Sequence, residues 1–315
     1  MAEALPIRAN TRKSGSFNKR KWIRYFWAYM FILPQLVFFI VFTIYPIIMS
    51  YVYSFYDWSG IGPLNKFVGF ENYERLLKDR QFWNAFENTF VYMIGVTALL
   101  LLTTLLMAIL LNNERMKGRT FYRTLYFLPV VTTTSIVGII MRMIFGNENA
   151  LVNDVLMSLG ILDEPYPWLG KATSAMIVVI IVGAWKFFGM MMVYWLAGLQ
   201  SLPRDIYESA SIDGANAFQA FRHITVPLLL PIGAVVLLLC VVECMHVFDL
   251  VKTLTNGGPY FATDMMDLYI YRQAFDVRGF PSLGYASAAG IFFGLSVFAM
   301  TLVLVWISRR AKAKD

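Results

Sequence analysis

The residues Tyr207–Pro231, YESASIDGANAFQAFRHITVPLLLP, decide the interpretation of this chain, because they form a charged connection between two strongly apolar segments. Just ahead of them, Pro203 and Asp205 favour a helix start, since proline suits the first turn and an acid there complements the helix dipole. Gly214 suits a helix end or a sharp turn. The run Asn216–Gln219 resembles a capping pair that opens a second helix. The stretch therefore predicts two short helices joined by a glycine.

Small and bulky side chains alternate in this hairpin, which leaves a surface into which another protein can settle closely. They are Ser209, Ala210 and Ala215 beside Tyr207, Ile212 and Phe218. The same mixture also allows a connector helix that lies on the membrane surface. Composition alone leaves both interpretations open.

The composition indicates a lipid-embedded, all-α integral membrane protein. The chain has 315 residues, of which 58% are apolar and 16% aromatic, and its mean hydropathy is +0.58. A stretch of about 20 apolar residues crosses a bilayer. Six stretches are long enough: Phe26–Val52, Phe90–Leu111, Tyr126–Phe145, Ser174–Leu196, Leu228–Leu250 and Tyr285–Ile307.

The positive charges predict the orientation of these spans. They cluster before the first span, at Arg8, Arg12, Lys13, Lys19, Arg20, Lys21 and Arg24. A second cluster follows the second span, at Arg115, Lys117, Arg119 and Arg123, and a third follows the last span, at Arg309, Arg310, Lys312 and Lys314. The connection 146–170 has no Lys or Arg. By the positive-inside rule both termini lie in the cytoplasm. We therefore divide the chain into a basic tail (1–25), a transmembrane domain (26–307) and a short cytoplasmic tail (308–315).

The net charge of +7 does not indicate nucleic-acid binding, because anionic membrane lipid accounts for basic tails that flank a membrane. A metal site is not predicted either, since Cys240 and Cys244 lack a nearby histidine pair and suit ordinary packing. No phosphate-binding loop of the form G-x-x-x-x-G-K-[ST] is present, so the chain does not encode a P-loop ATPase. Any energy that the protein uses must come from another polypeptide or from an ion gradient.

The pattern Glu208-Ser209-Ala210-x3-Gly214-x9-Ile224-x2-Pro227 resembles the EAA loop of binding-protein-dependent ABC importer permeases. Ser209 and Val226 replace the more usual Ala and Leu, which are mild departures. A wider resemblance, from about Pro34 to Ile307, is to the carbohydrate-uptake, maltose-type subgroup. Its residues are Leu196–Gln200, Leu202-Pro203, Tyr207-Glu208, Ile212–Ala215, Leu254–Pro259, Thr263, Tyr271, Ala274-Phe275 and Gly284–Ala288.

The resemblance implies a type I permease fold and one half of a translocation channel in a bacterial or archaeal cytoplasmic membrane. The expected partners are a second permease, favoured to be a different chain, two copies of a cytoplasmic ABC ATPase, and an extracytoplasmic solute-binding protein. This chain would hold no cofactor, since ATP and Mg²⁺ would bind to the ATPase. The EAA loop, about residues 199–228, would act as the cytoplasmic coupling helix. The residues that would dock on the ATPase and transmit its closure are Glu208, Ser209, Ala210, Asp213, Gly214, Ile224 and Pro227.

Ionisable side chains inside spans are costly and suggest a substrate pathway. Lys186 is one, and Glu243 and Asp249 lie three residues to either side of His246, which predicts a shared helical face. Sugars commonly stack on aromatic rings, which adds the nearby candidates Trp185, Phe187 and Tyr194. The alternative is that Lys186 forms a structural ion pair with Glu243 or Asp249.

The run Asn256-Gly257-Gly258-Pro259 predicts a tight turn in the outer connection before the last span. We expect this turn to lie near the binding protein or the solute gate.

Two other classes of function compete with the importer permease. An ion-coupled secondary transporter would use Glu243, His246 and Asp249 as a proton relay, but it leaves the 207–231 hairpin unexplained. An intramembrane enzyme is disfavoured, because the histidines His223 and His246 lie in no H-E-x-x-H arrangement and no G-x-S-x-G element is present.

Overall fold

A computed structural model of the chain describes residues 15–113, 116–146, 150–275 and 281–312. These residues are helical throughout, apart from turns and one isolated bridge between Tyr56 and Phe67, and they contain no strand. The predicted all-α class is therefore confirmed. The chain divides into two units, Met1–Val52 and Tyr53–Asp315.

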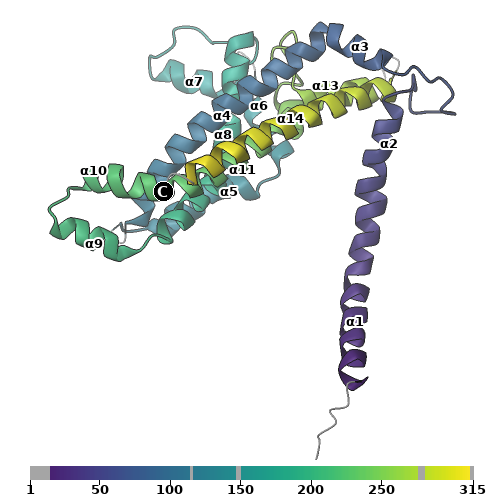
Figure 1. Cartoon of the computed structure of the whole chain (residues 1–315). Coiled ribbons are helices and arrows are strands. Elements are labelled where there is room, and N and C mark those ends of the chain that lie inside the picture. The colour runs from purple at the N-terminus through teal and green to yellow at the C-terminus, as the bar shows by residue number, and fades with distance from the viewer. Residues whose placement is uncertain (1–14, 114–115, 147–149, 276–280, 313–315) are drawn as a thin grey trace, which may run out of the picture. The chain divides into compact units, whose positions relative to one another are not determined.

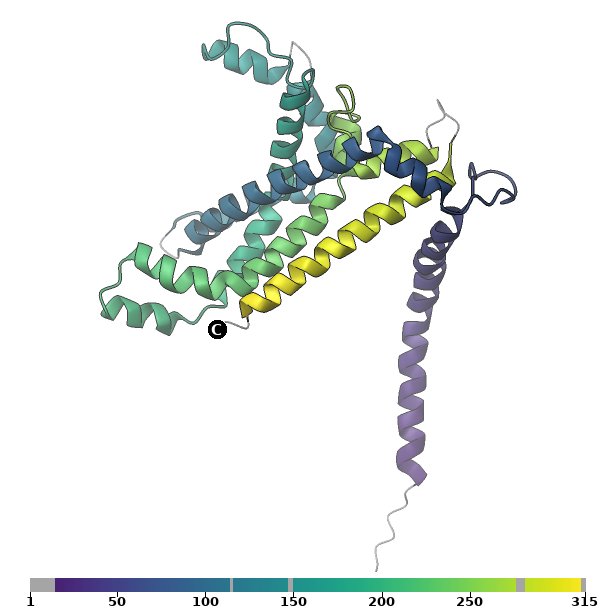
Figure 2. The same ribbon diagram turned by 45° about the horizontal axis from the view of Figure 1, so that its top comes forward.

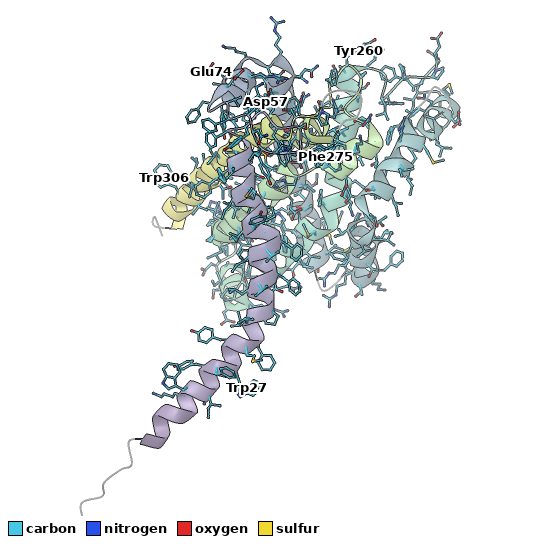
Figure 3. The ribbon with its side chains drawn as sticks, turned by 90° about the vertical axis from the view of Figure 1, so that its right-hand side faces the viewer. Trp27, Asp57, Glu74, Tyr260, Phe275 and Trp306 are labelled. Carbon is cyan, nitrogen blue, oxygen red and sulfur yellow. The ribbon has the colours of Figure 1, made fainter. Side chains whose placement is uncertain are left out.

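The first unit is one long apolar helix. It consists of α1 (Gly15–Phe39), a π-helical turn (Ile40–Ile44) and α2 (Tyr45–Tyr53), and its apolar part, Lys21–Tyr53, is long enough to span a bilayer. Side chains spread from it on every side, as Figure 3 shows around Trp27, and residues 21–48 are all exposed. A helix that is apolar all round requires lipid or protein around it.

Four long helices form the body of the second unit: α4 (Arg80–Asn112), α8 (Ala172–Gln200), α11 (Val226–Met245) and α14 (Leu283–Lys312). They run side by side in Figures 1 and 2. Helix α4 packs along α8, and α11 packs against both of them and against α14. The core between them is apolar and includes Tyr92, Leu100 and Met192.

The third predicted span, Tyr126–Phe145, is broken. Helices α5 (Arg119–Val131) and α6 (Thr134–Phe145) meet at an angle of 98°. The backbone is extended at Thr132 and Thr133, with ψ of 140° and 131°. Pro129 removes a helical N–H donor and the three consecutive threonines are β-branched, and both features disfavour a continuous helix. The described residues thus contain five straight candidate spans, or six if the bent pair counts as one.

Short helices lie at the two ends of this bundle. Helices α9 (Arg204–Ile212) and α10 (Ala217–Ala220) form a hairpin at one end, beside the last turns of α14 (Figures 1 and 2). The opposite end carries α3 (Glu71–Lys78), α7 (Leu151–Ser158), α12 (Phe248–Leu254) and α13 (Met266–Phe275). Figure 3 shows Glu74 and Tyr260 near that end and Trp306 of α14 towards the other.

Asp79 joins three of these elements. Its Oδ1 accepts hydrogen bonds from the backbone N–H groups of Gln81 (2.8 Å) and Phe82 (3.4 Å), so it caps α4. Its Oδ2 accepts hydrogen bonds from Tyr269 of α13 (2.6 Å) and Tyr285 of α14 (2.8 Å). Burial opposes ionisation of this carboxyl, but the four hydrogen bonds outweigh it and hold the pKa of Asp79 below its usual value. The start of α4 is thereby tied to both later helices.

Candidate functional site

The first arm of the hairpin begins and ends where the sequence predicts. Helix α9 starts at Arg204, directly after Pro203, and ends at Ile212. Gly214 then adopts φ +83°, a left-handed conformation that costs glycine little. The turn closes with a hydrogen bond of 2.9 Å from the Ala215 N–H to the Ala210 carbonyl. The predicted glycine turn is confirmed.

The second arm differs from the prediction of a separate short helix. Its start is a capping box, with 2.9 Å from the Gln219 N–H to the Asn216 side chain and 2.8 Å for the reciprocal bond, as predicted. The helix does not stop before the fifth span, however. Through a π-helical turn, Phe221–Thr225, it continues into α11, so Ala217–Met245 is one helix of 29 residues. A movement of the hairpin is therefore connected directly to the spanning helix.

The hairpin presents an exposed tip with apolar side chains. Ile212 and Phe218 are 86% and 67% exposed. Of the candidate coupling residues, Ala210 and Ile224 are half-buried, and the others are exposed: Glu208, Ser209, Asp213, Gly214 and Pro227. Behind this tip, the Tyr207 hydroxyl lies 2.9 Å from the Thr225 hydroxyl, which fastens α9 to the base of the spanning helix.

Lys186 stabilises the break in the third span. Its side chain is buried, with 3% exposed, and its Nζ donates hydrogen bonds to the carbonyls of Pro129 (2.7 Å), Val130 (3.0 Å) and Thr132. The last carbonyls of a helix have no partner within it, and a bend exposes them inside the bundle. The sequence offered Glu243 and Asp249 as partners for Lys186, and the structure shows backbone carbonyls in their place.

The predicted helical face of Glu243, His246 and Asp249 is wrong, because the fifth span ends at Met245 instead of Leu250. His246 has φ −114° and ψ 88°, outside the helical region, and Asp249 lies in the first turn of α12, where an acid complements the helix dipole. The His246 Nδ1 lies 3.6 Å from an Asp267 carboxylate oxygen on α13. That carboxylate raises the pKa of His246 against the opposing effect of burial.

The aromatic candidates on α8 face different directions. Phe187 and Tyr194 are seven positions apart and share a side of the helix, whereas Trp185 lies nine positions from Tyr194 and faces nearly the opposite way. Trp185 is 44% exposed, Tyr194 is 37% exposed and Phe187 is half-buried. Only Phe187 and Tyr194 can contribute to one lining surface. The described residues contain no group of three or more His, Cys, Asp or Glu side chains that could hold a metal ion.

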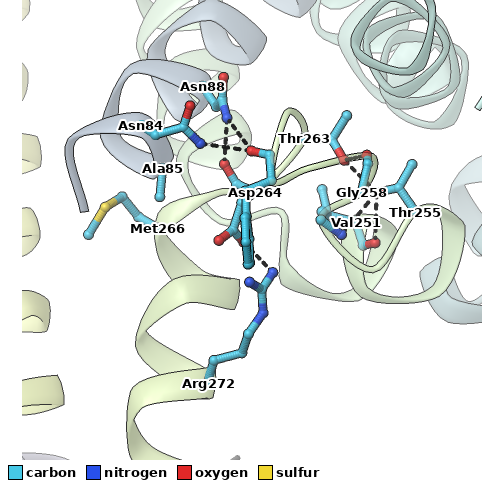
Figure 4. A network of polar contacts seen from close by, with 12 residues as sticks. Asn84, Ala85, Asn88, Val251, Thr255, Gly258, Thr263, Asp264, Met266 and Arg272 are labelled. Atoms are coloured by element: carbon cyan, nitrogen blue, oxygen red, sulfur yellow. Dashed lines mark hydrogen bonds and ion pairs between the residues drawn. The ribbon is translucent and has the colours of Figure 1, made fainter. Parts of the chain in front are cut away.

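The tight turn predicted at Asn256–Pro259 is confirmed, and a hydrogen-bond network holds it in shape (Figure 4). Asn256 and Gly257 have φ of 51° and 82°. Gly257 is buried, and a Cβ there would lie 2.3 Å from a guanidinium nitrogen of Arg272. The buried Thr263 hydroxyl donates to the Gly258 carbonyl at 2.6 Å.

The same network fixes the loop to α4 and α13. Asn84 and Asn88 donate to the Phe261 carbonyl at 2.7 and 3.1 Å, and Arg272 forms an ion pair of 2.6 Å with Asp264. Burial raises the pKa of Asp264 to about 6, although Arg272 opposes the shift. Tyr260, at the tip, remains 98% exposed.

Sequence reasoning missed the role of the carbonyls at the third-span break and the capping role of Asp79. The run of β-branched residues after Pro129 was a signal for the break, and an acid directly before a long apolar helix was a signal for the cap. The hydroxyl donors from Tyr269 and Tyr285 gave no sequence signal, because they come from positions 190 and 206 residues away.

The fold and the hairpin define a class: a multi-span helical membrane protein in which a short helical hairpin continues into a spanning helix. The family of binding-protein-dependent transport system inner membrane components matches residues 101–313. The chain is 32% identical to the lactose transport system permease protein of Rhizobium radiobacter, covering 90% of this chain and 95% of that protein. It is 34% identical to the trehalose/maltose transport system permease protein of Thermococcus litoralis, covering 90% and 93%.

A solved structure has the same fold. A chain of a bacterial alginate ABC transporter, solved in complex with an alginate pentasaccharide-bound periplasmic protein, superposes with a TM-score of 0.77 at 26% identity, covering 95% of this chain and 98% of that chain. The chain thus belongs to the family of binding-protein-dependent transport system inner membrane components. It is a permease subunit, a transport component and not an enzyme, with the type I importer fold. Family membership decides against the ion-coupled transporter and the intramembrane enzyme.

Proposed function

We propose that this chain forms half of the translocation path of an ATP-driven carbohydrate importer, and that its α9–α10 hairpin couples the path to a cytoplasmic ATPase. The observation that carries the proposal is the continuous helix Ala217–Met245, which joins the exposed hairpin to a spanning helix. Support for a carbohydrate comes from relatives named for lactose, arabinooligosaccharides and trehalose/maltose transport. The solute arrives on an extracytoplasmic binding protein.

The orientation follows from the charges at the hairpin end of the bundle. Arg119 and Arg123 at the start of α5 lie beside the hairpin, and the basic end of α14 lies at the same end of the bundle. The positive-inside rule puts this end, with both termini, in the cytoplasm. The loop around Asn256–Pro259 is then extracytoplasmic, where Tyr260 is free to meet the binding protein.

The coupling role rests on how the hairpin is built. Helix α9 carries Glu208, Ser209 and Ala210 and ends at Ile212, and the left-handed Gly214 turns the chain back. The second arm of the hairpin continues through Ile224 and Pro227 into the spanning helix. Asp213 is the C-terminal cap residue of the first arm, α9. A docked ATPase that moves this tip moves α11 with it. ATP and Mg²⁺ bind to the ATPase, of which the assembly holds two copies.

We assign the solute path to the side of α8 that carries Phe187 and Tyr194, and we add Glu243, which is exposed in the last turn of α11, as its ionisable candidate. Aromatic faces pack on sugar C–H groups. Trp185 faces away from this side, and His246 and Asp249 contribute to the outer mouth and not to the membrane interior. Lys186 acts on the path indirectly, by holding the bend between α5 and α6.

Because this chain forms half of a channel, the importer needs a second permease subunit. The family resemblance favours a second permease that is a different polypeptide. The helix Lys21–Tyr53 is apolar all round, so lipid or another part of the assembly must surround it.

The test compares two hairpin variants in the reconstituted importer. Glu208→Lys reverses the charge of an exposed side chain on α9, and Gly214→Val places a β-branched residue at φ +83°. We expect both to insert normally and to lose solute-stimulated ATP hydrolysis and uptake. Gly160→Val is the matched control, since Gly160 also has a positive φ (+67°) and open space around it, but lies after α7 at the other end of the bundle. Normal uptake and undiminished ATPase association in both hairpin variants contradict the coupling role.

A further inference from the structure

A cavity of about 720 Å³ lies under the hairpin, between α9, α10 and the adjoining ends of α4, α5 and α8. Its volume is in the range of small-ligand sites, about 300–1,000 Å³. Three arginines line it, Arg119, Arg123 and Arg204, against a single acid, Glu208. The described lining therefore carries an excess of two positive charges.

Arg123 is held so that part of its guanidinium group lacks a partner. Its Nη2 donates to the Leu111 carbonyl at 2.9 Å, which fixes the side chain at the end of α4. Its Nε is buried and has no hydrogen-bond partner in the described part of the chain. A buried donor without a partner is costly. This Nε has almost no accessible surface, so the donors that Arg123 offers to a ligand are the guanidinium N–H groups on the side that lines the cavity.

Arg119 extends the same donor surface. It lies four positions before Arg123 on α5, so the two side chains share one face of the helix. Two guanidinium groups at this spacing suit a phosphate, whose oxygens accept paired N–H donors in the fork geometry of arginine. A lone carboxylate offers fewer acceptors for the same set of donors.

The other walls of the cavity are apolar and belong to the ends of spanning helices. Ile109 of α4 and Leu199 and Leu202 at the end of α8 line it. On the same helix, Leu106 and Leu110 are 59% and 58% exposed. A ligand with a charged head and an apolar tail fits this combination.

We propose that the cavity under the hairpin is a binding site for a phosphate-bearing anion, supplied by the headgroup of an anionic phospholipid. Because Tyr207 and Glu208 of α9 and Thr225 at the base of α11 also line the cavity, the bound headgroup contacts both arms of the hairpin. It thereby sets how firmly the hairpin is held to the membrane-embedded helices. The site exists whether or not the hairpin docks on an ATPase.

Binding to the purified full-length chain tests the site. Phosphatidylglycerol is titrated in micelles of phosphatidylcholine and detergent, with retained lipid counted by native mass spectrometry. A second arm titrates inorganic phosphate without anionic lipid. Arg119→Gln and Arg123→Gln each remove a donor from the cavity, and Arg222→Gln is the matched control, because Arg222 is exposed on the neighbouring turn and does not line the cavity.

We expect phosphatidylglycerol affinity to fall at least about tenfold in Arg119→Gln and Arg123→Gln, the loss equivalent to one charged hydrogen bond, and to stay unchanged in Arg222→Gln. Binding of inorganic phosphate with the same arginine dependence supports the phosphate site with a soluble source in place of lipid. If Arg123→Gln does not fold in neutral lipid, Arg119→Gln alone decides. Equal binding of phosphatidylglycerol by Arg119→Gln and Arg222→Gln overturns the proposal. Failure of both phosphatidylglycerol and inorganic phosphate to bind also overturns it, and this is the result expected if an acidic protein segment fills the cavity instead.

Discussion

Replacing Lys186 with methionine tests whether this side chain holds the break in the third span. Methionine keeps the length and apolar character of the side chain but removes all three donors. The Pro129 carbonyl keeps a bond of 3.3 Å from the Thr132 N–H, whereas the carbonyls of Val130 and Thr132 lose the Lys186 donor. A buried acceptor left without a partner costs about 1–3 kcal/mol.

Two such carbonyls cost about 2–6 kcal/mol, and we take about 3 kcal/mol because both hydrogen bonds are only partly buried. Part of this is returned, because a buried ammonium is itself costly inside a membrane protein. We expect a net loss of about 2 kcal/mol in the free energy of unfolding. Hydrogen exchange of the backbone N–H groups in residues 129–134, of which Pro129 has none, is expected to accelerate, since the segment loses its anchor.

The assay is equilibrium denaturation of the purified chain in mixed micelles, with hydrogen exchange followed by mass spectrometry. Lys171→Met is the matched control, because Lys171 lies at the start of the same helix, where its ammonium contacts the Tyr166 ring face 4.5 Å from the centroid. An exposed contact of this kind is worth about 0.5–1 kcal/mol. Equal stability of the two variants, with unchanged exchange in residues 129–134, refutes the role given to Lys186.

Two further variants test the end of the bundle opposite the α9–α10 hairpin. Gly257→Ala introduces a Cβ at φ +82° that lies 2.3 Å from Arg272, so we expect it to destabilise the chain by about 2–3 kcal/mol. The control Gly160→Ala has a positive φ but no close neighbour, and we expect a loss of about 1 kcal/mol. Equal shifts of the melting temperature in the two variants contradict the close packing of Gly257 against Arg272. Asp267 raises the pKa of His246 in the folded chain. The protonated imidazole beside this carboxylate therefore stabilises the fold, fully below the ordinary histidine pKa of about 6.5, and the stabilisation is lost as pH rises through the higher pKa of the folded state. The melting temperature of the wild type is therefore expected to fall more between pH 6 and pH 8 than that of His246→Gln. Identical pH profiles of the two proteins contradict a stabilising His246–Asp267 pair.

Local sequence signals predicted the hairpin well. Pro203, Gly214 and the Asn216–Gln219 box each act within a few residues, so their backbone consequences can be inferred without tertiary contacts. The positions of most spans followed from the length of apolar runs for the same reason.

The break in the third span and the early end of the fifth were not predicted, because an apolar window carries no information on where a helix bends. Pro129 and the threonines after it were available as signals, but a proline is also tolerated within spans when neighbouring groups satisfy the freed carbonyls. Here the neighbour is Lys186, 57 residues away from Pro129. The pairing of His246 with Asp267 likewise depends on how α11, α12 and α13 fold back on one another.

The central claim is that the α9–α10 hairpin receives the movement of an ATPase. A photo-crosslinking amino acid at position 212, at the exposed tip, tests it in the assembled importer, with the same probe at position 260 on the opposite end as the control. Both native side chains, Ile212 and Tyr260, are exposed, at 86% and 98%. The coupling account predicts that the probe at 212 attaches to a polypeptide with a nucleotide-binding phosphate loop and that the probe at 260 does not. Attachment of the ATPase from neither position, or from 260 alone, would contradict it.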